Sequence, residues 1–356
     1  MSYLKNCWYA ATWSESLESG KLVPLTLLEQ SLVFYRDIQG AAVALDDMCP
    51  HRLVPLHLGK LLPDGNLQCG YHGLEFDSTG RCVKNPHGSG RVPRACAVRK
   101  YEVVEKHSLV WIWLGDQEPD RTTIPEYSYL DEGSGHDVGP RQTFLMDANY
   151  RNVVDNLMDL SHASFLHHDL LGNEETIRAE INVKEEGPYI FVRRDMHNVR
   201  PPLVRDLLFK QDGARVSMWN SIRWSPPCNL LNDVGTYVPG TDPTNYGGQL
   251  ACHILTPQTA TTTLYLTAAA RQGPLSIASQ NEEGAFKKRI ADLRRRAFME
   301  QDDPMLRAQQ ENMRKHPGAA PVFLEIDAAP VRCQRRLDSL INAEQNTALQ
   351  KNIAAT

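Results

Sequence analysis

The chain has 356 residues, a net charge of −5 and 42% hydrophobic residues, enough for about two domains with a large buried core. Acidic and basic residues are mixed, and the absence of a basic tract argues against a nucleic-acid partner or a membrane surface. The longest apolar run, residues 109–114, is far too short to span a bilayer. The N-terminus has neither the apolar core nor the cleavage site of a signal peptide, so we expect a cytoplasmic protein.

The first part of the chain has the pattern of short β-strands separated by turn residues. The candidate strands are residues 31–36, 41–45, 67–69, 74–76 and 109–114. The last of these is rich in aromatic side chains, which is typical of a buried strand. We therefore expect an all-β domain over residues 1–115 and a polar linker, closed by proline, at residues 116–125.

The pattern of residues 126–356 predicts a second domain with both helices and strands, so the fold class is α+β. A helix is expected over Asp155–His167, and a long helical region is expected from Glu282 to Lys315. Pro304 should interrupt that region, with Asp303 as the N-cap of the helix that follows. The candidate strands are residues 190–194, 216–224, 229–237, 249–255 and 262–268. A last helix is expected over residues 331–343.

Eight cysteines in a long intracellular chain argue against a disulfide scaffold. Two of them stand beside histidines, because Cys49-Pro50-His51 is followed seventeen residues later by Cys69-Gly70-Tyr71-His72. The other six have no ligand-like spacing and are interpreted as buried or inert thiols: Cys7, Cys82, Cys96, Cys228, Cys252 and Cys333.

Two thiolates and two imidazoles from two loops can bind zinc, or a [2Fe–2S] cluster with the cysteines on one iron and the histidines on the other. The cluster is favoured because each loop supplies one cysteine and one histidine, as two chemically distinct irons require. A structural zinc site commonly takes two cysteines from one half-site and two histidines from the other. Pro50 and Gly70 inside the loops would also let backbone N–H groups face the sulfurs.

A second pair of histidines, His162 and His167, follows two carboxylates. Asp155, Asp159 and His162 have the spacing that places side chains on one face of a helix. On an ideal helix the two histidines would be about 140° apart, so they could bind one metal only if the helix ends or distorts before His167. Taken alone, two such histidines are more often ordinary residues than ligands.

These motifs together resemble the large subunit of the Rieske non-heme iron oxygenases, and among them the O-demethylases that act on vanillate and dicamba. The resemblance rests on Cys49–Arg52 with Cys69–His72 and on Asn156–His162, and it spans nearly the whole chain. Further stretches agree: Asn6–Tyr9, Tyr71–Phe76, Trp111–Trp113 and His253–Pro257. The resemblance implies an N-terminal Rieske [2Fe–2S] domain, a C-terminal helix-grip catalytic domain and a head-to-tail homotrimer.

The resemblance also implies a mononuclear Fe(II) site, in which His162, His167 and one carboxylate form a facial triad that leaves positions for O2 and substrate. Glu300, Asp302 and Asp303 all lie near the expected helix break, and spacing alone does not choose among them. In the family the carboxylate precedes Met-Leu and a Gln-rich stretch, which selects Asp302, with Asp303 as the next candidate.

Two more residues of this segment are candidates for the site. Asp159, one turn before His162, is expected to orient a histidine by accepting the proton of its free N–H. The resemblance adds that Asp159 bridges to a cluster histidine, His72 of the partner subunit, and so conducts electrons. Asn156 either lines the pocket or caps a polar face, and Asp155 is interpreted as structural.

For the substrate, Asn232 and His253 resemble pocket residues of the O-demethylases, although a histidine on an apolar strand is ordinarily a core residue. Basic residues such as Arg223 would help if they face inward. The resemblance implies O-demethylation of a small methoxylated aromatic acid with release of formaldehyde. Hydroxylation of a methyl group or of the ring, on another aromatic acid or sulfonate, is the alternative.

No glycine-rich nucleotide fingerprint follows a strand anywhere in the chain. We therefore expect NADH to act through a separate reductase, with or without a ferredoxin. The alternative outside enzymes is a Rieske electron carrier. That alternative leaves the helix histidines and all the residues after the linker without a role.

Overall fold

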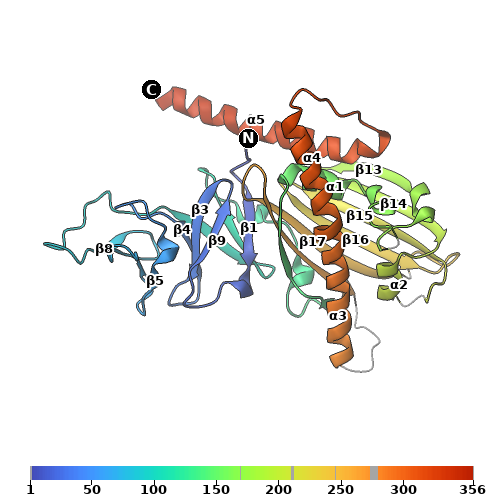
Figure 1. The fold of residues 1–356 in the computed structure, drawn as a ribbon, viewed down its shortest axis with the longest axis horizontal. Helices are drawn as coiled ribbons and strands as arrows, with labels where there is room; N and C mark the ends of the chain where they lie inside the picture. Colours follow the sequence, from blue (N-terminus) through green and yellow to red (C-terminus); the bar gives the residue numbers. More distant parts are fainter. Residues whose placement is uncertain (1, 169, 210–211, 245, 273–279, 356) are drawn as a thin grey trace. The chain divides into compact units, whose positions relative to one another are not determined.

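The computed structural model describes residues 2–168, 170–209, 212–244, 246–272 and 280–355 (Figure 1). The chain divides into two compact units. The first holds Tyr3–Ile124 and Thr256–Ala260, and the second holds Pro125–Leu255 and the chain from Thr261 onward. The return of Thr256–Ala260 to the first unit is a feature that no sequence pattern indicates. Within these described ranges, no helix has the length and apolarity that crossing a membrane requires.

The first unit is built from two antiparallel sheets. Six strands follow the order β1-β10-β9-β4-β3-β2, and four short strands follow the order β5-β6-β7-β8. The strands are β1 Trp8–Trp13, β2 Val23–Leu27, β3 Gln30–Arg36, β4 Ala42–Asp46, β5 Lys60–Leu61, β6 Leu67–Gln68, β7 Glu75–Phe76, β8 Cys82–Lys84, β9 Lys100–Lys106 and β10 Leu109–Trp113. Every residue of β1 and β10 is buried, and the Trp8 and Trp113 rings meet edge to face at 5.5 Å. The all-β prediction for this region is confirmed.

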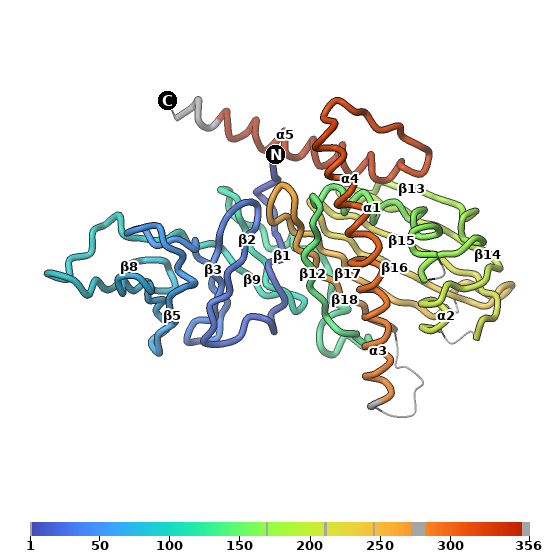
Figure 2. Tube along the Cα trace, in the orientation of Figure 1, coloured from blue at the N-terminus to red at the C-terminus, as the bar shows by residue number. Residues whose placement is uncertain are grey.

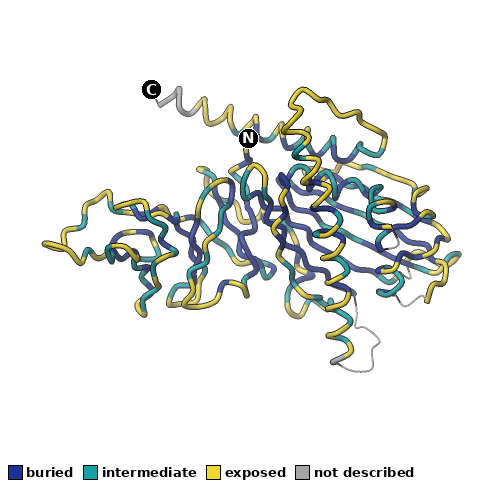
Figure 3. The backbone as a smooth tube through the Cα atoms, viewed as in Figure 1, coloured by how far each residue is buried: buried dark blue, intermediate teal, exposed yellow. Residues whose placement is uncertain are grey.

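The second unit contains one large antiparallel sheet. Its order is β11-β18-β17-β16-β15-β14-β13, and β12 also pairs with β18. The strands are β11 His136–Val138, β12 Gln142–Met146, β13 Glu180–Glu186, β14 Tyr189–Val199, β15 Val216–Ser225, β16 Asn229–Tyr237, β17 Gly247–Pro257 and β18 Thr263–Gln272. Successive side chains of a strand point to opposite faces, so one face of β15, β16 and β17 can line a pocket beneath the helices. Figure 3 shows how thoroughly these central strands are buried.

The helices of the second unit are α1 Tyr150–Met158, α2 Leu203–Phe209, α3 Gln280–Arg295, α4 Asp303–Lys315 and α5 Ala328–Ala355. The helix expected over residues 155–167 therefore begins earlier and ends at Met158. Asn149 begins it as N-cap, because its side chain accepts the Arg151 N–H at 2.9 Å. A polar stripe and the buried residues Val153, Val154, Leu157 and Met158 share this helix, as the sequence predicts.

The helix break expected at Pro304 is absent. A π-helical segment, η7 Arg296–Asp302, joins α3 to α4 without interruption (Figure 2). Its last bond runs from the Asp303 N–H to the Phe298 carbonyl, five residues back. In an α-helix, proline removes one hydrogen bond and clashes with the carbonyl four residues earlier. The wider π-helical turn before Pro304 accommodates the proline, so the helix continues. Asp303 is not an N-cap, because its Oδ1 accepts the Asp147 N–H at 2.8 Å.

Asp155 links α1 to α5. Helix α5 is longer at both ends than the predicted helix over residues 331–343. Its Oδ1 accepts a hydrogen bond from Gln334 Nε2 at 2.7 Å. Burial raises the pKa of Asp155 to about 6, although Gln334 and Arg151 act in the opposite direction. A raised pKa means that the folded protein binds this proton more tightly than the unfolded chain does. The contribution of the bound proton to the stability of the folded state is complete below the ordinary pKa of an aspartate. It is lost as the pH rises through about 6.

We therefore expect Asp155→Asn to stabilise the protein at pH 7.5, by on the order of 2 kcal/mol in the free energy of unfolding. The uncharged amide avoids the cost of a buried carboxylate and keeps an oxygen for Gln334. Urea unfolding at pH 4.5 and pH 7.5 measures the effect, and the difference between variant and wild type should be larger at pH 7.5. The assignment would be contradicted if the stability of the variant relative to wild type were less favourable at pH 7.5 than at pH 4.5.

Candidate functional site

Two loops of the first unit place Cys49 and Cys69 in the same backbone geometry. The amide of each cysteine donates to the carbonyl five residues later, and its carbonyl accepts from the amide four residues later. These bonds are Cys49 N–H to Val54 O at 2.9 Å, Leu53 N–H to Cys49 O at 2.9 Å, Cys69 N–H to Leu74 O at 2.8 Å and Gly73 N–H to Cys69 O at 3.0 Å. Leu53 and Gly73 both have positive φ, of 60° and 70°, which closes each turn.

The side chains of these loops form a set of two thiols and two imidazoles. Cys49 and Cys69 are buried with their thiols in contact, whereas the His51 and His72 rings lie nearer the surface with centroids 4.6 Å apart. Burial raises the pKa of Cys49 to about 11, although the backbone N–H groups of His51 and Arg52 donate to its sulfur. Two inner sulfurs and two outer imidazoles fit a cluster whose two irons have different ligands.

In the second unit, the segment after α1 brings His162 and His167 beside Asp302, the last residue of η7. Their ligand atoms lie within 4.8 Å of one another. Asp302 Oδ1 is 3.2 Å from His167 Nε2 and 3.7 Å from His162 Nε2. The convergence is possible because α1 ends at Met158, so the two histidines do not share one continuous helix. The structure places Asp302 beside the histidines, while Asp303 binds the backbone of Asp147.

The two histidines are oriented through Nδ1, and Asp302 is oriented through Oδ1, the oxygen that also faces the histidines. Asn156 Nδ2 donates to Asp302 Oδ1 at 3.1 Å, and His167 Nδ1 donates to Gln301 Oε1 at 2.9 Å. His162 Nδ1 donates to the backbone carbonyl of Asp159. With Nδ1 occupied, both histidines turn Nε2 toward Asp302, as metal-binding histidines commonly do. No sequence motif marks Gln301; its position next to Asp302 is the one available signal.

The contact made by Asp159 differs from the sequence expectation. Its backbone carbonyl, not its carboxylate, accepts the His162 N–H, and the carboxylate lies 3.9 Å from that nitrogen. The reason is that Asp159 is the C-cap of α1 with extended backbone angles, φ −90° and ψ 96°. Its carboxylate instead accepts the Ser161 N–H at 2.7 Å and remains partly exposed.

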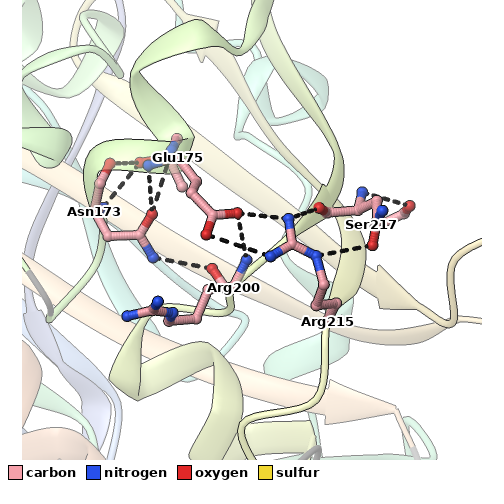
Figure 4. A network of polar contacts seen from close by, with 7 residues as sticks. Asn173, Glu175, Arg200, Arg215 and Ser217 are labelled. Carbon is pink, nitrogen blue, oxygen red and sulfur yellow. Dashed lines mark hydrogen bonds and ion pairs between the residues drawn. The ribbon is translucent and has the colours of Figure 1, made fainter.

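The segment that carries both histidines is tied to the sheet by arginines. Arg194, buried on β14, donates to the carbonyls of Leu160 and Thr176. Figure 4 shows a second network, in which Arg215 binds Glu175 at 2.7 Å. The network also contains the bonds from Arg200 N–H to Glu175 Oε2 at 3.1 Å and from Asn173 Nδ2 to Arg200 O at 2.9 Å. These contacts hold the loop after α1 in one position against β14 and β15.

A cavity of about 130 Å³ borders the triad. Apolar side chains of α1, β15, β16 and β17 line much of it, and both predicted pocket residues, Asn232 and His253, lie on its wall. Arg223 is not on that wall, because its guanidinium stacks 5.0 Å from the ring centre of Tyr189. The basic residues that do line the cavity are Arg205 and Arg294, which no sequence pattern indicates.

Comparison with known proteins finds two families that match separate parts of the chain. Residues 7–102 match the Rieske [2Fe–2S] domain family, and residues 146–343 match the vanillate O-demethylase oxygenase C-terminal domain family. The chain is 33% identical to the oxygenase component of dicamba O-demethylase from Stenotrophomonas maltophilia, over 97% of this chain and 99% of that protein. It is 34% identical to the oxygenase component of chloroacetanilide N-alkylformylase from Rhizorhabdus wittichii, over 96% of this chain and 97% of that protein.

Solved structures of dicamba monooxygenase have the same fold. The structure bound to 3,6-dichlorosalicylic acid aligns with a TM-score of 0.89 at 32% identity, over 97% of this chain and 99% of that chain. The structure with non-heme iron and dicamba aligns with a TM-score of 0.81 at 31% identity, over 98% of this chain and 100% of that chain.

Proposed function

Because the chain belongs to the Rieske non-heme iron oxygenases of the vanillate and dicamba O-demethylase group, we propose that it demethylates a methoxylated aromatic acid similar to vanillate. The chain is an oxygenase component, so its electrons come from a separate reductase and O2 is its co-substrate. The observation that carries the proposal is the cavity beside His162, His167 and Asp302, which is apolar along much of its wall and polar at Asn232 and His253.

In this proposal His162, His167 and Asp302 bind the mononuclear iron. Bound there, the iron supplies activation of O2, and the cluster held by the two cysteine–histidine loops supplies electrons one at a time. The residues around them keep the ligands in place. The Asp159 carbonyl and Gln301 fix the two imidazoles, while Asn156 donates to the Asp302 oxygen that faces them.

His253 has the properties of a hydrogen-bond donor to the substrate. Burial lowers the pKa of His253 to about 3, so its ring is neutral at physiological pH. Its Nδ1 contacts the hydroxyl of Tyr265, which has no other acceptor in the described part of the chain and therefore donates to it. The ring then carries its own hydrogen on Nε2, a buried atom without a partner in the structure. Asn232 offers an amide on the neighbouring strand.

The reaction is balanced by two electrons and two protons. One oxygen atom of O2 enters a C–H bond of the methoxy group, and the other leaves as water. The hydroxylated product is a hemiacetal, which collapses to a phenol and formaldehyde. If the methyl group is on carbon, the same insertion gives a stable benzylic alcohol.

Product analysis on matched methoxy- and methyl-substituted benzoates, with a cognate reductase and NADH, tests the proposal. We expect formaldehyde to form in step with NADH and O2 consumption from the methoxy substrates. A benzylic alcohol without any demethylation would replace the proposal by methyl hydroxylation. Cis-dihydrodiols alone, or no oxidation of any aromatic acid, would refute both.

We further propose a cytoplasmic homotrimer, with an NADH-dependent reductase that acts directly or through a ferredoxin. In the trimer, Asp159 of one subunit faces His72 of the partner subunit. The partly exposed Asp159 carboxylate and the outward position of His72 support this arrangement.

A further inference from the structure

Two arginines, Arg205 and Arg294, line the cavity. Arg205, on α2, donates through Nη2 to the Trp219 carbonyl at 3.3 Å, and its Nη1 is buried with no hydrogen-bond partner in the part of the chain that the structure describes. Arg294, near the end of α3, donates through Nη2 to the side chain of Gln249. Neither forms an ion pair with any acidic residue that the structure describes. The Asp233 carboxylate attracts the Arg205 guanidinium without forming an ion pair with it, and the Arg294 guanidinium repels it.

The charge of the cavity wall is consequently positive. Of the residues that line it, Arg205, Arg294 and Asp302 are charged, and an Fe(II) ion held by Asp302 would add two further positive charges. Burying a charge that no ion pair compensates is costly. Burial accordingly lowers the pKa of both arginines to about 10, which still leaves them protonated near neutral pH. An anion in the cavity would offset this cost.

The sheet register shows where such an anion would lie. Residues paired across β15, β16 and β17 form rows, and every second row faces the pocket. One such row contains Asn220, Val234 and Gln249. Arg294 binds Gln249 in that row, and Arg205 binds the carbonyl of Trp219, the residue before Asn220. Both arginines therefore reach the same end of the wall.

The other end of the wall carries different donors. Asn232 lies in the next row, opposite Ala251, and His253 lies one row further, opposite Leu230. Rows on one face of a strand are about 7 Å apart. The wall thus has an arginine end, and His253 lies toward the opposite end, where Arg294 still adds to the effect of burial in lowering the pKa of His253. Asn220, Asn232 and His253 each also keep a buried polar atom that has no partner among the described residues, so the wall as a whole is suited to a polar ligand.

We propose that Arg205 and Arg294 together bind the ionised acid group of the aromatic substrate, a carboxylate or a sulfonate, and thereby determine that the enzyme accepts aromatic oxyanions and rejects their neutral counterparts. This inference rests on the proposed function for the identity of the ring substrate. The acid group lies at the arginine end of the wall, and Asn232 and His253 hold a second polar substituent. A guanidinium pair matches the planar carboxylate and also the three oxygens of a sulfonate.

Equilibrium binding to the holoenzyme, with cluster and iron in place, tests the pair without requiring turnover. The probes are 4-methoxybenzoate, 4-methoxybenzenesulfonate and the neutral methyl ester of the benzoate, titrated by calorimetry. The variants are Arg205→Gln and Arg294→Gln, with Arg205→Lys and Arg294→Lys as charge-conserving versions. Arg289→Gln is the matched control, because Arg289 lies exposed on the same helix as Arg294.

We expect wild type to bind at least one of the two acids more tightly than the ester. Each glutamine variant should weaken acid binding by about 10- to 100-fold and leave ester binding unchanged, since a hydrogen-bonded charge is lost. The lysine variants should recover part of the affinity, and Arg289→Gln should behave as wild type. The more affected acid identifies whether carboxylate or sulfonate is the natural group. The absorption spectrum of the cluster and the iron content verify that each variant is folded and loaded.

Three results would overturn the inference: ester binding as tight as acid binding, glutamine variants with wild-type affinity for the acids, or equal losses for acid and ester. A failure of the proposed function gives a different pattern. In that case the acids bind through the arginines but no formaldehyde forms. Conversely, formaldehyde from neutral methoxyarenes at the rate seen with the acids would refute the arginine pair and leave the demethylase proposal intact.

Discussion

Replacing Asp302 by alanine is expected to remove the mononuclear iron, spare the cluster and reduce turnover below detection. Without its carboxylate the site has only two neutral ligands, His162 and His167, and no negative charge to offset a divalent cation. The pKa of His167 already reflects that charge. Burial lowers this pKa, but the Asp302 carboxylate and the Gln301 side chain together raise it above the usual value of a histidine. Iron content should fall from about three to about two atoms per chain, while the absorption of the cluster persists.

Asp303→Ala is the matched control for this experiment. Asp303 is adjacent and similarly buried, but its carboxylate binds the backbone of Asp147. We expect this variant to keep its iron and to lose a modest amount of stability. Loss of iron in Asp303→Ala, with wild-type iron and activity in Asp302→Ala, would reassign the third ligand.

Replacing Asp159 by asparagine is expected to retain both metal centres and still reduce turnover by more than the 10- to 100-fold that is typical of residues behind a metal ligand. The metal should be retained because the backbone carbonyl, which the substitution does not change, orients His162. The carboxylate is 3.9 Å from that imidazole and is the group that the trimer proposal places between the two metal centres.

The informative measurement is the rate at which a chemically reduced cluster is reoxidised in the presence of substrate and O2. It should be slow in Asp159→Asn and fast in wild type. Asp155→Asn, on the same helix and turned toward α5, is the control and should turn over normally. If Asp159→Asn runs at the wild-type rate with the reductase, the proposed electron bridge is wrong.

Local patterns in the sequence predict several parts of this molecule well. Strands β3, β4, β10, β15 and β16 agree with the expected ranges within one residue at each end. The loops around Cys49 and Cys69 could be located because each keeps its ligands within four residues. His162 and His167 were identifiable as a pair, although their approach depends on the end of α1 at Met158, which the amphipathic pattern does not mark.

Other parts depend on contacts that a local pattern does not contain. Pro304 predicts a helix break, but the π-helical register before it keeps the helix continuous and positions Asp302. Gln301 acquires its role only because His167 arrives from 134 residues away. Arg205 and Arg294 are ordinary basic residues of helical segments until the fold brings both to one cavity wall.

The central claim, that oxygen enters a methyl C–H bond of a methoxylated aromatic acid, is tested most directly by turnover of 4-methoxybenzoate under ¹⁸O₂. We expect one formaldehyde per O2 consumed and a phenol that contains no ¹⁸O, because the ring–oxygen bond of the substrate is never broken. ¹⁸O in the phenolic oxygen, or O2 consumption that yields no formaldehyde, would contradict it.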